Sequence, residues 1–164
     1  MARCEGLGPF APTQLGDLLG HADITVKPVI DLADQISVNA YEHPEHLEER
    51  VHLTRVGDYF PYASSTTRSA DLDHPTPYQE GGPPGQTGTH NSGPLTRRHH
   101  RYKTHAGYRA RQTGPGTYVW RTPHGHYLKV DHTGTHPIPP TLGAVLIDGS
   151  HLELRLAAAF MDAA

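Results

Sequence analysis

The chain has little cysteine and no long apolar run, and each shortage excludes a class of protein. Cys4 is the only cysteine in 164 residues, which excludes an intramolecular disulfide and a cysteine-based zinc site. A protein without disulfides suits a reducing compartment, so we expect a cytoplasmic location. No apolar run approaches the roughly 20 residues that span a bilayer, and the N-terminus lacks the apolar core of a signal peptide. We therefore expect no contact with a membrane.

Hydrophobic residues are also scarce, at 35% of the chain, whereas glycine and proline are plentiful, with 17 and 15 residues. This composition predicts a small core and long loops. The length suits about one domain. Mixed helix-like and strand-like segments favour an α+β fold.

Acidic residues are missing from residues 81–130, which carry eight basic residues and no carboxylate. Residues 1–80 carry thirteen acidic and five basic residues. A long segment without carboxylates is typical of a surface that faces a polyanion, because any Asp or Glu there would repel phosphate. The alternative is a chance block of charge on a solvated face.

The N-terminal third predicts three short elements. Leucines before Gly20 suggest a short helix, and β-branched residues over 24–32 predict a strand, with Pro28 favouring a sheet edge. A second helix is expected to begin at Pro44, with Leu47 and Val51 on its apolar face.

The middle of the chain predicts a ββα unit. Residues 58–78 resemble a β-hairpin whose second strand ends near Asp73 and His74, and residues 79–93 form an irregular Gly/Pro-rich loop. Ser92 is a candidate N-cap for a helix that has Pro94 in its first turn and ends near Lys103 or His105. Two or three further strands follow, and the C-terminal end favours a helix, although its alternating leucines suit a strand equally well. We divide the chain at 1–56, 57–112 (nuclease module), 113–138 (β-hairpin extension) and 139–164 (tail with a terminal helix).

Four side chains in this unit have the chemistry that phosphodiester hydrolysis needs. A histidine with a pKa near neutrality can take a proton from water, and a hard divalent cation binds carboxylate oxygen and tolerates imidazole. His74 is the candidate general base, Asp73 and His100 are candidate metal ligands, and Asn91 is a candidate for holding the loop that orients His74. Each has a simpler interpretation, because the chain has 14 histidines and Asp and Asn are common in turns.

The cationic residues of the segment are candidate contacts to a nucleic-acid backbone, namely Arg97, Arg98, Arg101, Lys103, Arg109 and Arg111. Tyr102, Tyr108 and Trp120 could stack on bases, but core packing is the more common use of such residues.

These motifs resemble the HNH endonucleases of the ββα-metal fold. Residues from about 21 to 138 are similar to the C-terminal part of the actinobacterial HNH endonucleases that carry domain of unknown function 222 upstream. The runs that carry the resemblance are KPVIDLADQISVNAYEHPEHLEERV, DYFPYASSTTRSADLDHPTPY, GPPGQTGTHNSGPLTRRHHRYKTHAGYRARQ and YVWRTPHG. The resemblance implies Asp73 as a metal ligand, His74 as the general base, Asn91 as the middle Asn, His100 as the closing metal ligand, and DNA as the substrate.

The chain departs from this family where many relatives bind a structural zinc through paired cysteines. Residues 59–70 contain no cysteine, and Thr96 and His99 stand where one pair would be. Position 104 is Thr where some HNH sites have another His, so we expect water or phosphate to complete the shell of the cation.

Together these features predict a metal-dependent DNA endonuclease that uses one divalent metal ion, Mg²⁺ or Mn²⁺ in the first place and Zn²⁺ as another option. The alternatives are a non-catalytic DNA-binding fragment and a His-rich zinc-binding protein. The sequence does not indicate an oligomeric state.

Overall fold

The computed structural model describes residues 2–4, 8–20, 23, 25, 31–150, 152–154 and 156. The chain forms two compact units, residues 1–31 and 32–164, which are described separately. In the first unit, β1 (Ala2–Cys4) pairs with β2 (Gly8–Phe10), followed by η1 (Pro12–Gln14) and α1 (Leu15–Leu19). The short helix predicted before Gly20 is α1, whereas most of the strand predicted over 24–32 lies outside the described residues.

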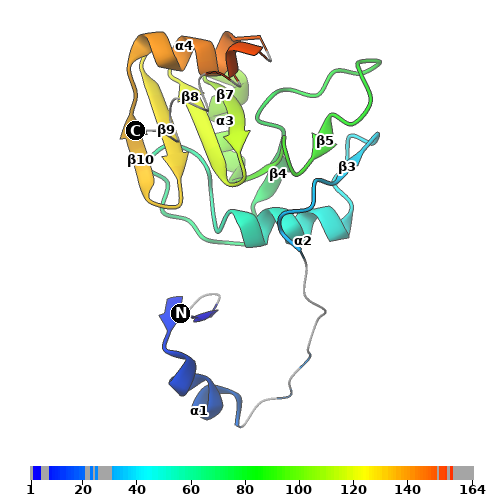
Figure 1. Cartoon of the computed structure of the whole chain (residues 1–164), viewed down its shortest axis with the longest axis vertical. Helices are drawn as coiled ribbons and strands as arrows, with labels where there is room; N and C mark the ends of the chain where they lie inside the picture. Colours follow the sequence, from blue (N-terminus) through cyan, green and yellow to red (C-terminus); the bar gives the residue numbers. More distant parts are fainter. Residues whose placement is uncertain are drawn as a thin grey trace. The chain divides into compact units, whose positions relative to one another are not determined.

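The second unit is built on a four-stranded antiparallel sheet with the order β10-β9-β8-β7 (Figure 1). Its strands are β7 (Arg109–Gly114), β8 (Thr117–Arg121), β9 (Tyr127–Asp131) and β10 (Gly134–Pro137). The sequence predicted two or three strands here, so the sheet is one strand larger than expected. The β7–β8 turn contains Gly116 at a φ of 62°, a conformation that glycine adopts without strain.

The central strand β8 is buried on both of its faces. Successive side chains of a strand point to opposite faces, and Tyr118 and Trp120 pack with Tyr59 and Leu95. Val119 packs on the other face with Leu146 and Ile147 of α4 (Pro140–Asp148), which lies across the sheet in Figure 1. The sequence did not predict α4, because its prolines and Gly143 resemble a loop.

The predicted ββα unit is present in a different form. β4 (Asp71–Asp73) pairs with β6 (Gly93–Leu95), and α3 (Arg97–His105) follows at once. The local hairpin predicted over 58–78 is therefore wrong, because the partner of β4 comes from beyond the Gly/Pro-rich loop.

The start of α3 also differs from the prediction. Pro94 lies in β6 and not in a helical turn, and Thr96 precedes the first helical residue. The Ser92 hydroxyl donates to the Gly88 carbonyl oxygen at 2.7 Å and caps no helix.

Two further elements enclose the loop. β3 (Ser37–Val38) pairs with β5 (Thr87–Gly88), so residues 79–93 are not wholly irregular as predicted. α2 (Glu45–Thr54) begins directly after Pro44 and buries Leu47 and Val51, as predicted.

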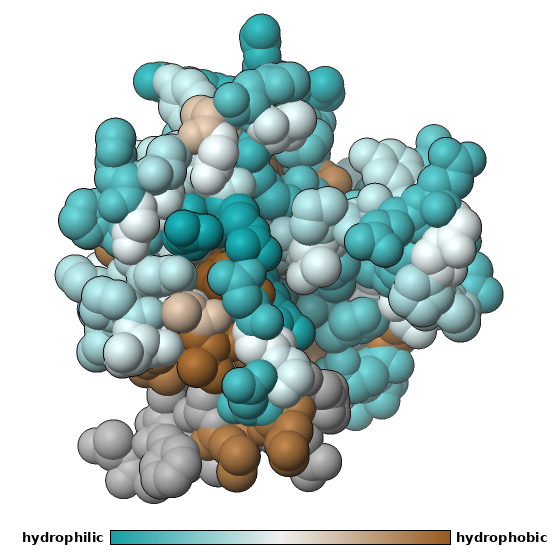
Figure 2. Space-filling model, turned by 90° about the horizontal axis from the view of Figure 1, so that it is seen from above, coloured by the Kyte–Doolittle hydropathy of each residue, from teal (hydrophilic) through white to brown (hydrophobic). Residues whose placement is uncertain are grey.

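The fold is α+β, and the predicted divisions at 56/57, 112/113 and 138/139 all fall within the unit of residues 32–164. None of the helices in the described part of the chain is long and apolar enough to cross a bilayer. Hydrophilic residues cover most of the face seen in Figure 2, and hydrophobic residues reach the surface there in a smaller area. The small core expected from the composition is concentrated around β8.

Candidate functional site

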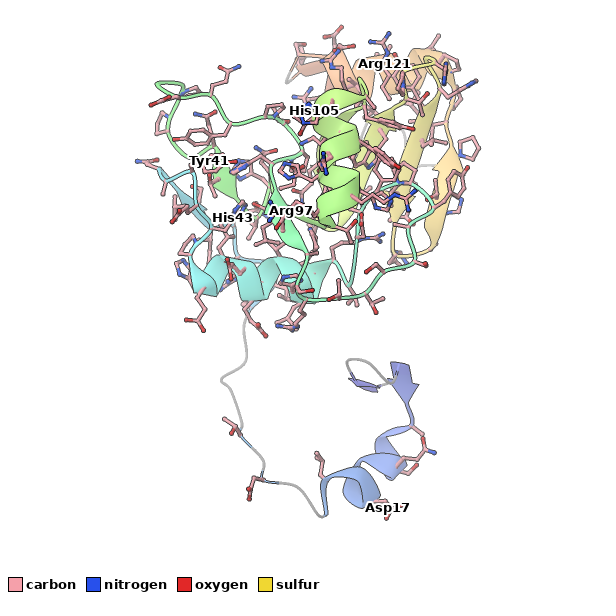
Figure 3. All side chains as sticks on the ribbon, turned by 180° about the vertical axis from the view of Figure 1, so that it is seen from behind. Asp17, Tyr41, His43, Arg97, His105 and Arg121 are labelled. Atoms are coloured by element: carbon pink, nitrogen blue, oxygen red, sulfur yellow. The ribbon has the colours of Figure 1, made fainter. Side chains whose placement is uncertain are left out.

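A cleft of about 590 Å³ opens where β4 ends. Its lining includes Asp73 and His74 from the end of β4 and His100 and Lys103 from α3. The helix that supplies the second pair runs from Arg97 to His105, both labelled in Figure 3. Three of the four predicted site residues therefore meet in one cleft, and Asn91 lies behind it.

Asp73 is a buried carboxylate with a different partner on each oxygen. Its Oδ2 accepts hydrogen bonds from the Tyr59 hydroxyl and from Lys103 Nζ, the latter at 2.6 Å. Its Oδ1 lies 3.3 Å from His100 Nε2. Lys103 Nζ also donates to the backbone carbonyl of His74. One oxygen is thus occupied from within the protein, and the other faces His100.

The separation of Asp73 Oδ1 and His100 Nε2 fits a shared cation as well as a hydrogen bond. Adjacent ligands of an octahedral Mg²⁺ are about 3 Å apart, since each lies about 2.1 Å from the metal. The observed 3.3 Å is close to that separation. Among the described residues, no group of three or more His, Cys, Asp and Glu side chains is arranged to hold a metal ion. Any cation here would therefore have two protein ligands.

Asp71 lies on the same face of β4 as Asp73, because the two residues are two positions apart. Its Oδ2 is 3.8 Å from His100 Nδ1 and 2.8 Å from Arg97 Nε. The imidazole of His100 therefore lies between two carboxylates, with a different ring nitrogen nearest to each. An acceptor on the Nδ1 side favours a proton there and leaves the Nε2 lone pair for Asp73 or a cation.

The ring of His74 is fixed by a hydroxyl whose own proton is already used. Thr87 Oγ1 donates to the Ala40 carbonyl oxygen at 2.6 Å and lies 2.8 Å from His74 Nε2. A hydroxyl has a single proton, so Thr87 can only accept from His74. His74 Nε2 therefore carries the proton, and Nδ1 is the basic nitrogen.

Burial lowers the pKa of His74 below its ordinary value; Asp73 opposes the shift and Lys103 adds to it. A lowered pKa keeps the imidazole neutral near pH 7, the state in which it can accept a proton. Tyr41 stacks on this ring at 5.4 Å between centroids, and Tyr78 lies 5.7 Å away.

Asn91 makes three side-chain hydrogen bonds to the backbone of the loop. Its Oδ1 accepts from Thr76 N at 2.8 Å, and its Nδ2 donates to the carbonyl oxygens of Thr76 and Gln86 at 2.9 and 3.0 Å. The side chain thus joins the residues just after His74 to those just before Thr87. These contacts are of the kind expected from the sequence, and a role in catalysis stays a prediction.

A second histidine, His43, is held like His74. Its Nε2 lies 2.8 Å from Ser92 Oγ, which donates its only proton to the Gly88 carbonyl oxygen. The rings of His43 and His74 are 4.7 Å apart. Burial, and then the nearby His74, lower the pKa of His43 to about 4.

The six predicted DNA contacts are not equally available. Lys103 is a correction, because its side chain is only 9% exposed and its ammonium is bound to Asp73. Arg111 donates to the carbonyl oxygens of Ile147 and Gly149 at the end of α4, and Arg109 pairs with Asp148 at 2.6 Å.

The three remaining cations lie on α3 with exposed side chains. Arg97 pairs with Asp71, and Arg98 lies 5.5 Å from the centre of the Tyr102 ring. Arg101 is exposed at the middle of the same helix. Together they make α3 the most accessible cationic element beside the cleft.

A buried carboxylate occupies the region where relatives have paired cysteines. Asp58 Oδ2 lies 2.7 Å from His99 Nδ1 and accepts from Thr96 N at 3.0 Å. Its Oδ1 accepts from Phe60 N at 2.8 Å. Thr96 and His99, the two residues that stand in place of a cysteine pair, thus both bind Asp58.

Several residues of this site were not identified from the sequence. Asp71 could have been found, because it alternates with Asp73 on a predicted strand. Thr87 and Tyr41 could not, because only the β3–β5 pairing brings them to His74. Tyr102 and Trp120 were assigned to the core, and Trp120 is fully buried whereas Tyr102 is 39% exposed.

No model of a protein family matches the chain. Comparisons with curated proteins and with solved structures likewise gave no match. The resemblance to HNH endonucleases therefore depends on the quoted motifs and remains a prediction.

Proposed function

We propose that the chain is a metal-dependent DNA endonuclease of the HNH type, with a ββα-metal module formed by β4, β6 and α3. One observation carries the proposal. A neutral histidine with a free Nδ1 lies in the same cleft as a carboxylate oxygen and an imidazole nitrogen that face each other at 3.3 Å. Base and ligand pair are the parts that phosphodiester hydrolysis by water requires.

Each residue then has a defined task. His74 takes a proton from water on Nδ1, while Thr87 keeps Nε2 protonated. Asp73 Oδ1 and His100 Nε2 would hold the cation, which when bound supplies positive charge beside the scissile phosphate. Lys103 and Tyr59 fix the other oxygen of Asp73. Asn91 fixes the loop on which His74 depends.

Nicking of supercoiled plasmid DNA with Mg²⁺, Mn²⁺ or Zn²⁺ tests the proposal. We expect His74→Ala to lower cleavage by at least about 100-fold, the usual contribution of a general base. DNA retention by this variant should stay within about twofold, because little charge is lost. Normal cleavage by His74→Ala would contradict the assignment.

Metal binding is tested with His100→Ala and Asp73→Asn. His100 is partly exposed, so its removal does not disturb the core, and Asn keeps the size of the buried Asp73 side chain. Both variants should weaken Mn²⁺ binding, measured by calorimetry or by electron paramagnetic resonance. His124→Ala, an exposed histidine outside the cleft, is the matched control.

A second candidate function is a DNA-binding fragment without catalysis, and one observation favours it. Lys103 already supplies a positive charge to Asp73 at 2.6 Å. If that ion pair replaces the cation, the protein should retain DNA in a salt-dependent manner and cleave none with any of the three metals.

A further inference from the structure

The two sides of the cleft differ in chemistry. One side is aromatic and apolar, with Tyr41, Pro75, Pro77 and Tyr78 from the segment before α2 and the loop after β4. The other side is polar and cationic, with His100 and Thr104 from α3 and Arg109 and Arg111 from β7. A ligand that matches both sides needs an apolar, flat part and an anionic part.

Tyr41 is an exposed aromatic ring that is nevertheless held in place. It is 62% exposed. It stacks on His74 with an interplanar angle of 29°, and it meets Tyr78 edge to face at 5.4 Å. Figure 3 shows Tyr41 and His43 together beside the site, with α3 nearby. An exposed, positioned aromatic ring is the kind of surface on which nucleic-acid bases stack.

The charges around His74 indicate on which side a phosphate lies. A second pocket of about 450 Å³ on the other side of His74 is lined by Glu42, Glu48 and Asp71, together with His43, His52 and Arg68. Carboxylates repel a phosphodiester, whereas the first cleft has Arg109 and Arg111 and no carboxylate except Asp73. An anionic strand is therefore favoured on the side of Tyr41 and Tyr78.

We propose that this cleft binds an unpaired nucleotide, with its base stacked on Tyr41 and Tyr78 and its phosphate toward α3 and β7. The preferred substrate is then single-stranded or locally unpaired DNA. A base within a duplex is covered by its neighbours and cannot stack on a side chain until it leaves the helix. The volume of about 590 Å³ is that of a pocket for a small ligand and suits a nucleotide. This inference rests on DNA being the substrate of the proposed function.

Equilibrium binding without divalent metal tests the stacking independently of cleavage. Three fluorescent oligonucleotides of one sequence are compared by anisotropy in EDTA at one salt concentration: a single strand, a duplex with a short unpaired bubble, and a perfect duplex. We expect the unpaired forms to bind about tenfold tighter or more. Stacking contributes about 1–3 kcal/mol per base, so Tyr41→Ala should reduce binding of the unpaired forms by about 5- to 150-fold.

Matched variants separate stacking from other effects. Tyr41→Phe keeps the ring and should bind like the wild type, whereas Tyr41→Leu keeps apolar area without a ring and should bind like Tyr41→Ala. Tyr62→Ala removes another exposed tyrosine, 73% exposed and outside the cleft, and should change nothing. A 2-aminopurine base in the single strand should be quenched by the wild type and Tyr41→Phe only.

The outcomes distinguish the two proposals. Equal affinity for paired and unpaired forms, or unchanged binding by Tyr41→Ala, overturns the stacking inference even if plasmid DNA is nicked. Absence of both DNA binding and nicking overturns the proposed function. If Tyr41→Ala shows an altered circular dichroism spectrum, Tyr78→Ala takes its place, with the same loss expected.

Discussion

His43 and His74 each give the Nε2 proton to a hydroxyl oxygen, and each is left with a basic Nδ1. Their rings are neighbours, and protonation of one opposes protonation of the other. Thr87 and Ser92 can fix these rings because their own protons go to backbone carbonyls. The protonation state of the site thus depends on residues that have no acid–base chemistry of their own.

Stability should fall in acid because of His43. Its pKa in the folded protein is about 4, below the ordinary value of about 6.5 in an unfolded chain. Between these values the unfolded chain binds a proton that the folded protein does not, so stability is lost as the pH falls from 6.5 toward 4. The loss is at most about 1.4 kcal/mol per pH unit.

Urea denaturation of His43→Gln measures this contribution, because Gln does not titrate in the range. We expect the stability of the variant to fall less steeply than that of the wild type between pH 6.5 and 4. His124→Gln, at an exposed position, should follow the wild type. Identical curves for the wild type and His43→Gln would mean that His43 is not kept neutral by its surroundings.

Among the elements, α3 is attached to the rest of the unit at its N-terminal end by Asp58. This carboxylate is 2% exposed and binds the backbone on both sides of it, at Phe60 and Thr96, as well as His99. Removing one partner of a buried pair leaves the other partner and the backbone donors unsatisfied. Asp58→Ala should therefore lower the free energy of unfolding by about 3 kcal/mol.

The comparison is Arg68→Ala, which removes the Arg68–Glu49 pair between more exposed side chains. Pairs of that kind contribute about 1 kcal/mol or less. Chemical denaturation measures both variants. Similar losses in the two would show that Asp58 does not have the structural importance that its burial implies.

Local elements could be predicted from local patterns, and pairings between distant segments could not. The spacing of Leu47 and Val51 and the preceding Pro44 were enough for α2. β4 was placed within 58–78, but its partner β6 lies beyond a long loop, and nothing in residues 58–78 indicates that pairing. The start of α3 was placed too early for the same reason, because Pro94 suits both a strand edge and a helical first turn.

The site shows the same division. Asp73, His74, Asn91 and His100 were found from order and spacing, since their residue types are those of the chemistry. The state of His74 depends on Thr87, which sits in an apparently irregular loop. Lys103 carries a charge typical of a DNA contact, and only the packing of α3 on β4 shows that this charge belongs to Asp73.

At the scale of the whole molecule, charge on the sequence overstates the charge available to DNA. Of the six predicted contacts, Lys103, Arg109 and Arg111 already bind groups of the protein, and Arg97, Arg98 and Arg101 remain on the surface of α3. Three phosphate contacts predict a slope of log K against log salt of about −2 to −3. Six contacts would give about −4 to −5.

Titration of DNA binding with salt measures this slope. Arg101→Ala should make it shallower by about one, with affinity reduced for all sequences alike. Arg121→Ala removes the same charge from the end of β8 and should leave the slope unchanged. A wild-type slope near −5 would mean that the internal ion pairs open when DNA binds.

The hydrogen bond from Thr87 to Ala40 spans 47 positions of the chain, and the β3–β5 ladder that supports it has only two residue pairs. So short a ladder opens at a small free-energy cost, long before the core around Trp120 is exposed. When it opens, His74 loses the acceptor that selects its tautomer. Chemical competence at this site therefore disappears through a local fluctuation, while the rest of the unit is still folded.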